Sequence, residues 1–109
     1  MIIWDIEPSL LCTKHLHELH DDIHALWLIL TTEKYVHTHH PEIKRWQGKL
    51  KALHARHDEI IIEFARRGIE HTSSLDFSNA TGNEIQSVFL HTPVEQARIL
   101  TSLNCYCFV

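Results

Sequence analysis

Long hydrophobic runs, glycine-rich loops and a surplus of basic charge are all missing from this 109-residue sequence. No apolar run reaches the roughly 18 residues that a membrane-spanning helix needs, so we expect no membrane partner. The opening stretch MIIWDIEP has no basic segment and no long apolar one. This argues against a secretion signal, and we expect a cytoplasmic location in a bacterial cell or a virus-infected host cell. The three glycines are too few for a loop that cradles phosphate.

The scarcity of basic charge limits how this chain can meet nucleic acid. The formal net charge is −4 with neutral histidines, whereas nonspecific DNA binding depends on neutralising phosphates. The eleven histidines could turn the balance positive in mild acid or beside a polyanion. Any contact with nucleic acid must therefore be local.

Cysteine is also sparse. The three cysteines, Cys12, Cys105 and Cys107, form an odd set without a secretion signal, which predicts reduced thiols. The spacing Cys105-x-Cys107 does not match a zinc-knuckle half-site, so we interpret the pair as partly buried tail residues.

What the sequence does contain is helical periodicity, and no strand alternation or repeat accompanies it. Apolar residues at helical spacing predict a helix from an N-cap at Thr13 to Thr31 or Thr32. A second helix of about 27 residues should run from Pro41 to Arg67, with Gly68 as its stop. Thr92 opens a capping box before a shorter third helix that ends near Leu103. The fold class is therefore all-α, a single compact domain over residues 1–109 with three main helices and ordered terminal segments.

Shorter elements complete this prediction. Pro8 should open a single helical turn to Leu11, and the apolar stretch Met1–Ile6 should be pinned against the core. We also expect a short helix over Asn83–Leu90. The chain then closes in the apolar tail CYCFV.

The first long helix carries titratable groups on both margins of its apolar stripe. His17, His20 and His24 share one flank, and His15 and Asp22 share the other. A carboxylate at the margin of a buried stripe has a raised pKa and can exchange protons, which makes Asp22 a candidate catalytic acid or base. The alternative is a surface carboxylate near His15.

Histidine spacing also raises the question of metal binding. His20-x3-His24 places two imidazoles on one helix face, but the motif HExxH is absent, and such pairs occur by chance on exposed helices. We therefore expect no dedicated metal site and no cofactor, and we interpret His57 as a core or groove histidine. A histidine-based metal-binding protein remains an alternative.

Basic residues cluster on the second predicted helix. Arg45, Lys49, Arg56 and Arg67 should project in a narrow arc that could follow a phosphate backbone. The alternative is an ordinary solvated helix flank. His39 and His40 precede this helix, and its free N–H groups should favour anions there.

Six stretches agree with a known family in order and spacing. They are IWDI at 3–6, His15-Leu16 followed by acidic residues one and two turns on, HHPE at 39–42, RWQGKLKAL at 45–53, RRG at 66–68, and ATGNEIQSVF at 80–89. Together they resemble the pyrimidine dimer DNA glycosylase family, to which the phage endonuclease V belongs, and in particular its short bacterial and viral branch. The resemblance covers nearly the whole chain and implies an all-α fold of three main helices.

The resemblance also implies a mechanism, that of a base-excision glycosylase with AP lyase activity. The α-amine of Met1 would attack C1′ of a damaged or modified nucleotide, form a Schiff base and lead to strand cleavage by β-elimination. An α-amine titrates well below a lysine, so more of it is neutral and nucleophilic at working pH. Because Ile2 is bulky, we expect Met1 to be retained.

When the chain is compared with the family position by position, Asp22 occupies the place of the catalytic glutamate. Its side chain is one methylene shorter. Asp21 and Ala25 stand where phosphate-binding arginines are found, and Ile2 replaces another arginine near the nucleophile. The lysine-rich aromatic tail of the phage enzyme is missing.

The expected site therefore joins the catalytic pair Met1 and Asp22 to a DNA-binding set. That set is His20, His24, His39, His40, Arg45, Lys49 and Arg56. The expected partner is damaged or abasic double-stranded DNA, bound by a monomer. The alternative is a non-catalytic binding or regulatory protein on the same fold, with a nucleotide-sized ligand or a protein partner.

Overall fold

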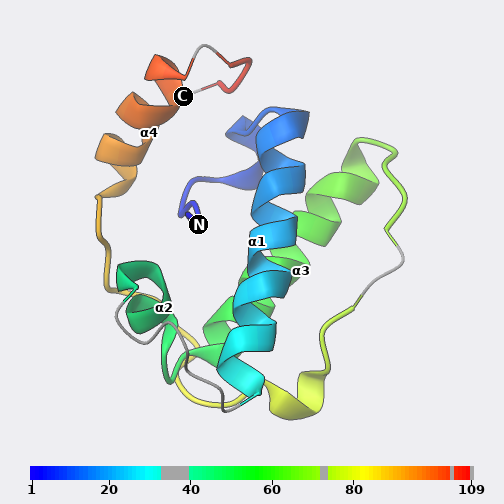
Figure 1. Cartoon of the computed structure of the whole chain (residues 1–109). Helices are drawn as coiled ribbons and strands as arrows, with labels where there is room; N and C mark the ends of the chain where they lie inside the picture. The colour runs from blue at the N-terminus through cyan, green and yellow to red at the C-terminus, as the bar shows by residue number, and fades with distance from the viewer. Residues whose placement is uncertain (33–39, 72–73, 104, 109) are drawn as a thin grey trace.

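A computed structural model describes residues 1–32, 40–71, 74–103 and 105–108, and every regular element in these ranges is helical. The α-helices, shown in Figure 1, are α1 (Thr13–Thr31), α2 (Pro41–Trp46), α3 (Leu50–Arg66) and α4 (Pro93–Ser102). Single 3₁₀ turns lie at Pro8–Leu10 and Phe77–Asn79. The predicted all-α fold class is confirmed. Within the described ranges, no helix is both long enough and apolar enough to span a bilayer.

Helix α1 supplies the centre of the core, and α3 crosses behind it (Figure 1). Leu16, Leu19 and Ile23 of α1 are fully buried, and Leu53 and Ile60 of α3 are buried equally. Each such side chain contributes about 1.5–3 kcal/mol of hydrophobic stabilisation. The predicted first helix is thus confirmed, although its N-cap is Cys12, one residue before the expected Thr13.

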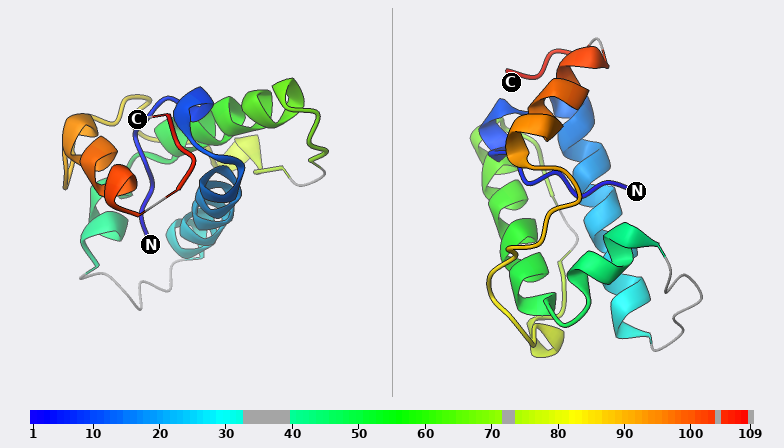
Figure 2. Two further views of the ribbon diagram at one scale, coloured as in Figure 1. Left: turned by 90° about the horizontal axis from the view of Figure 1, so that it is seen from above. Right: turned by 90° about the vertical axis from the view of Figure 1, so that its left-hand side faces the viewer.

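The N-terminal segment lies between this helix pair and α4 (Figure 2). Ile3, Trp4 and Ile6 are at most 5% exposed, so the expectation of a pinned N-terminus is confirmed. Leu100 of α4 is fully buried in the same core.

The prediction of one continuous helix from Pro41 to Arg67 was wrong. The chain leaves α2 after Trp46 and starts α3 at Leu50, with Gly48 between them at φ 73°. That left-handed conformation, which glycine adopts at little cost, turns the chain. The expected stop is confirmed, since Gly68 at φ 72° follows α3.

The predicted helix over Asn83–Leu90 was also wrong. Residues 80–83 instead run beside the start of α3, where Asn83 N–H donates to the Gly48 carbonyl at 2.9 Å. The carbonyls of Thr81 and Asn83 accept from Lys51 and Ala52 N–H at 2.9 and 3.0 Å. Because these groups cap α3, they are not available for hydrogen bonds within a local helix.

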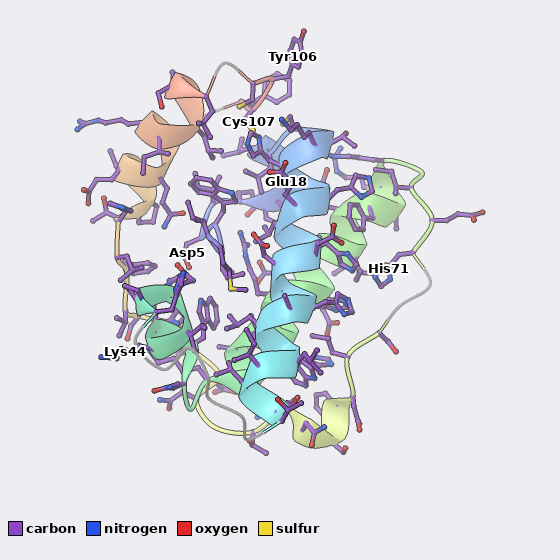
Figure 3. The ribbon with its side chains drawn as sticks, viewed as in Figure 1. Asp5, Glu18, Lys44, His71, Tyr106 and Cys107 are labelled. Carbon is purple, nitrogen blue, oxygen red and sulfur yellow. The ribbon has the colours of Figure 1, made fainter. Side chains whose placement is uncertain are left out.

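The C-terminal elements agree with their sequence signals. Thr92 and Glu95 form the expected capping box, and Pro93 occupies the first turn of α4. Beyond α4, Phe108 N–H donates to the Leu10 carbonyl at 2.7 Å. The tail is therefore attached to the N-terminal part of the molecule, and Cys107 lies beside the start of α1 (Figure 3).

Candidate active site and histidine cluster

Two buried arginines hold the N-terminal segment by its backbone. Arg56 of α3 donates to the Trp4 carbonyl at 2.6 and 3.1 Å and also to the Ile6 carbonyl. Arg45 of α2 donates to the Ile3 carbonyl at 2.9 Å. Hydrogen bonds from a guanidinium are stronger than those between neutral groups. The backbone immediately after the α-amine is therefore held in place from two helices.

The Arg45 guanidinium is also the centre of a buried ion network. It pairs with Asp5 at 3.0 Å and with Glu42 at 2.5 Å, and its side chain is only 2% exposed. It further donates to the Val88 carbonyl at 3.0 Å, while Gln96 of α4 donates to Asp5 at 2.8 Å. One network thus joins the N-terminal segment, α2, the 80–92 connection and α4.

The α-amine of Met1 and the Ile2 N–H both lie close enough to the Asp22 carboxylate to favour its charged form. Burial raises the pKa of Asp22, although the amine and the Ile2 N–H oppose this effect. Glu18 and Asp21 on the same helix raise it further. The structure therefore brings the two predicted catalytic groups to one side of α1.

A small cavity of about 130 Å³ opens beside Met1. Its polar lining includes His40, Glu42, Arg45, His91 and Gln96. His40 is exposed and caps α2, accepting from Glu42 N–H at 3.2 Å through Nδ1. A small group could therefore approach the amine from the side of α2 and α4.

The expected arc of basic residues is absent, because the break at Gly48 separates Arg45 from α3. Arg45 and Arg56 point into the protein, where their donors bind backbone carbonyls and carboxylates. Lys49 is half-buried and donates to Gln86 at 2.6 Å. The predicted DNA contact of His39 lies outside the described residues.

His20 and His24 do not line the Met1 side of α1. Their Nε2 atoms, 3.1 Å apart, meet those of His57 and His71 on the other flank. His20 Nε2 lies 2.6 Å from His71 Nε2, and His24 Nε2 lies 3.1 Å from His57 Nε2. We name these four residues the histidine cluster.

The histidine cluster favours neutral rings. Burial, together with the adjacent rings of His24 and His71, lowers the pKa of His20 to about 4. Burial and the rings of His24 and His20 likewise lower the pKa of His57 to about 4. Burial also lowers the pKa values of His24 and His71. The lowered pKa values favour the neutral form of these rings, in which one ring nitrogen carries a lone pair.

A second group of possible ligands gathers at the start of α1, and we name it the cysteine cluster. It consists of Cys12, His15, Cys105 and Cys107, whose ligating atoms all lie within 4.8 Å of one another. His15 Nδ1 is 3.1 Å from Cys12 Sγ and 3.5 Å from Cys107 Sγ. The two tail cysteines are partly buried, as expected.

Sequence reasoning missed both clusters as sets. His20-x3-His24 and Cys105-x-Cys107 were visible, but their partners are 33 to 95 residues away in sequence. No local spacing predicts that these distant residues come together, and the polar segment around His71 carries no motif that marks it as a ligand. The inward direction of Arg45 and Arg56 was missed for the same reason, since it depends on distant carbonyls.

Comparison with known proteins gives one match. The family model described as pyrimidine dimer DNA glycosylase matches residues 1–77, which include Met1, α1, α2 and α3. Neither the search of curated proteins nor that of solved structures returned a match. Since the matched region covers well over half of the sequence and contains both Met1 and Asp22, this chain belongs to the pyrimidine dimer DNA glycosylase family.

Proposed function

We propose that this protein is a base-excision DNA glycosylase with AP lyase activity, with the Met1 α-amine as nucleophile and Asp22 as its acid–base partner. Family membership supports DNA glycosylase chemistry on a DNA substrate. The single observation that supports the mechanism is that the Met1 amine and Ile2 N–H both favour the charged form of the partly buried Asp22 carboxylate, which indicates that the groups are close together.

The neutral amine attacks C1′ of the damaged nucleotide, and the bond from C1′ to the base breaks as the N–C1′ bond forms. The base leaves with the electron pair of that bond and takes up a proton. Loss of a proton from the attached amine then frees its lone pair to form the C1′=N bond of the Schiff base, while the C1′–O4′ bond breaks and O4′ takes up a proton, which opens the sugar ring. On an abasic site, the same amine condenses with the C1′ aldehyde and releases water.

Asp22 is suited to the proton transfers in these steps. Its raised pKa brings the carboxyl closer to working pH, where it can both accept a proton from the amine and return it to the sugar. As a carboxylate, it also stabilises the cationic Schiff base. Loss of a proton from C2′ then forms the C2′=C3′ bond, the C3′–O bond breaks, and the phosphate leaves with its electron pair, which cuts the strand.

The target nucleotide must leave the base stack before C1′ can meet the amine. The exposed His40 beside the Met1 cavity and the half-buried Lys49 are the proposed groups for DNA contact. Arg45 and Arg56 instead position the nucleophile through the carbonyls of residues 3–6.

Borohydride trapping on duplex DNA with one abasic site tests this proposal. The chain must begin at Met1 without a tag, and we expect a covalent adduct that maps to the first residue. A matched protein with one glycine placed before Met1 displaces the amine and should give no adduct at Met1. An adduct on a lysine, or none at all from the native chain, would contradict the mechanism.

A second candidate is a non-catalytic binding or regulatory protein on the same fold. The side chain of Asp21, next to Asp22, is 81% exposed and places negative charge where phosphate would approach. Binding to intact and abasic duplex at two salt concentrations separates the candidates. Binding that is absent, or that ignores both salt and the abasic site, would favour the second.

A further inference from the structure

The histidine cluster has the geometry of a four-coordinate metal site rather than that of a simple hydrogen-bonded group. The three closest Nε2–Nε2 distances are 2.6, 3.1 and 3.1 Å. Ideal tetrahedral zinc coordination places ligand nitrogens about 3.4 Å apart. The pairs at 3.1 Å are thus about 0.3 Å closer than this and the pair at 2.6 Å about 0.8 Å closer, and all four ligating atoms lie within 4.8 Å of one another. The four residues come from α1, α3 and the chain after α3.

The four imidazoles of the histidine cluster converge through their Nε2 atoms. Each ring carries one N–H, so converging Nε2 atoms can at best alternate as donor and acceptor. His24 Nε2 faces the Nε2 atoms of both His20 and His57 at 3.1 Å. A cation at the centre would accept all four lone pairs at once.

Carboxylates stand behind two of these rings. Asp21 Oδ1 lies 3.6 Å from His20 Nδ1, and Asp58 Oδ1 lies 3.6 Å from His57 Nδ1. His57 Nδ1 is buried and makes no hydrogen bond at that separation. In metal sites the second ring nitrogen commonly donates to a carboxylate, which orients the ring and raises its basicity.

We propose that His20, His24, His57 and His71 bind one zinc ion in a closed structural site. Imidazole ligands in tetrahedral array suit zinc, and four protein ligands leave no open position for a catalytic water. The site is on the flank of α1 away from the proposed nucleophile: His71 lies to the right of α1 in Figure 3, and the N-terminus lies to its left in Figure 1. Zinc therefore fastens the chain after α3 to the two long helices and takes no part in strand cleavage.

Metal analysis of the untagged protein tests this site. Zinc content and competition with a chromogenic chelator should be measured for the parent, for His71→Gln and for His17→Gln. His17 is exposed on the same helix and outside the cluster, so it serves as the matched control. We expect His71→Gln to weaken zinc binding by roughly 100-fold or more and Asp58→Asn by roughly 10–100-fold, with His17→Gln unchanged.

Chelator treatment gives an independent measurement. With Cys105→Ser in every chain, so that the cysteine cluster cannot contribute, it should lower the Tm of the chain with an intact histidine cluster and of His17→Gln but not further lower that of His71→Gln. Equal zinc affinity in the parent and His71→Gln, or a metal-free parent that binds no added zinc, would overturn the proposal.

The cysteine cluster independently carries a second zinc proposal. Three sulfurs and His15 Nδ1 converge, and Cys12 N–H donates to Cys107 Sγ at 3.1 Å, as backbone amides do to bound thiolates. Tail residues and the start of α1 would thereby be joined across more than 90 positions of sequence (Figure 3). We infer a Cys3His structural zinc site that closes the tail onto the helix.

Cobalt(II) distinguishes the two sites because only thiolates give strong sulfur-to-cobalt charge-transfer absorption in the near ultraviolet. We expect this band in the parent and in His71→Gln, and its loss in Cys105→Ser. Each variant thus serves as the control for the other site. A native chain without the band, or with a Cys12–Cys107 disulfide in the freshly purified protein, would overturn the cysteine site.

Discussion

The burial of Asp22 affects both the stability of the fold and the acid–base role that we propose for this side chain. Its pKa is raised mainly by burial, so the folded protein holds this proton more tightly than the unfolded chain does. Stability attributable to Asp22 is therefore highest below its unfolded pKa and falls as pH rises through the folded pKa.

The substitution Asp22→Asn tests this pH dependence of stability. The variant should lose borohydride trapping by at least about 100-fold, since misplacement or loss of a catalytic group commonly costs this much. Its Tm relative to the parent should be more favourable at pH 7 than at pH 4, measured by thermal unfolding at both values. A relative Tm that moves in the opposite direction would show that Asp22 is stabilised as a carboxylate.

Arg56 acts at the residue scale by holding the Trp4 and Ile6 carbonyls. Because hydrogen bonds to charged groups contribute about 1.5–3 kcal/mol each, Arg56→Gln should lower the free energy of unfolding by about 3 kcal/mol. Trapping should fall at least tenfold at temperatures where near-ultraviolet circular dichroism shows a folded protein. Arg98→Gln, at an exposed position of α4, is the control and should change neither quantity.

At the scale of elements, the contact between the 80–83 segment and the start of α3 depends on glycine. A Cβ on Gly82, which has φ 83°, would meet the Gly48 carbonyl oxygen at 2.1 Å. Gly68, with φ 72°, has open space around the same position.

The two glycines therefore form a matched pair for urea unfolding. Gly68→Ala should cost about 1–2 kcal/mol for the left-handed backbone alone. Gly82→Ala should cost more, because the 80–83 segment must also move away from α3 and leave its first N–H groups without their caps. Equal costs would mean that the segment is not required for the stability of α3.

The same elements show what the sequence could and could not predict. Helix α1, the capping box of α4 and the stop at Gly68 depend on local patterns, and all were predicted. The break at Gly48 was missed because helical spacing continues across it. The non-helical 83–90 stretch was missed because its partners lie on α2, in the turn after α2 and at the start of α3. Resemblance supplied Met1 and Asp22 as the proposed catalytic pair, but periodicity gave no sign that Arg45 and Arg56 would point inward.

At the scale of the whole molecule, few positive charges face a possible DNA. With a net charge of −4 and two arginines directed inward, we expect only two or three phosphate contacts. The logarithm of the binding constant should then fall with that of salt concentration with a slope of about −2 to −3.

Lys49→Gln should make this slope less negative by about one, because one phosphate contact is lost. Lys14→Gln, near the cysteine cluster, should leave the slope unchanged. Fluorescence anisotropy with abasic duplex at several salt concentrations measures both. A slope near zero in the parent would remove phosphate recognition from the proposed mechanism.

The network around Arg45 also affects when, during synthesis of the chain, the N-terminal segment can reach its final position. Asp5 depends on Gln96, which the ribosome adds 91 residues later. At about 5–20 residues per second, the nascent chain exists for roughly 5–20 s before this partner is made, and longer before it leaves the exit tunnel. The segment that carries Asp5 is thus made well before Gln96 and reaches its complete set of contacts only after α4 has been synthesised.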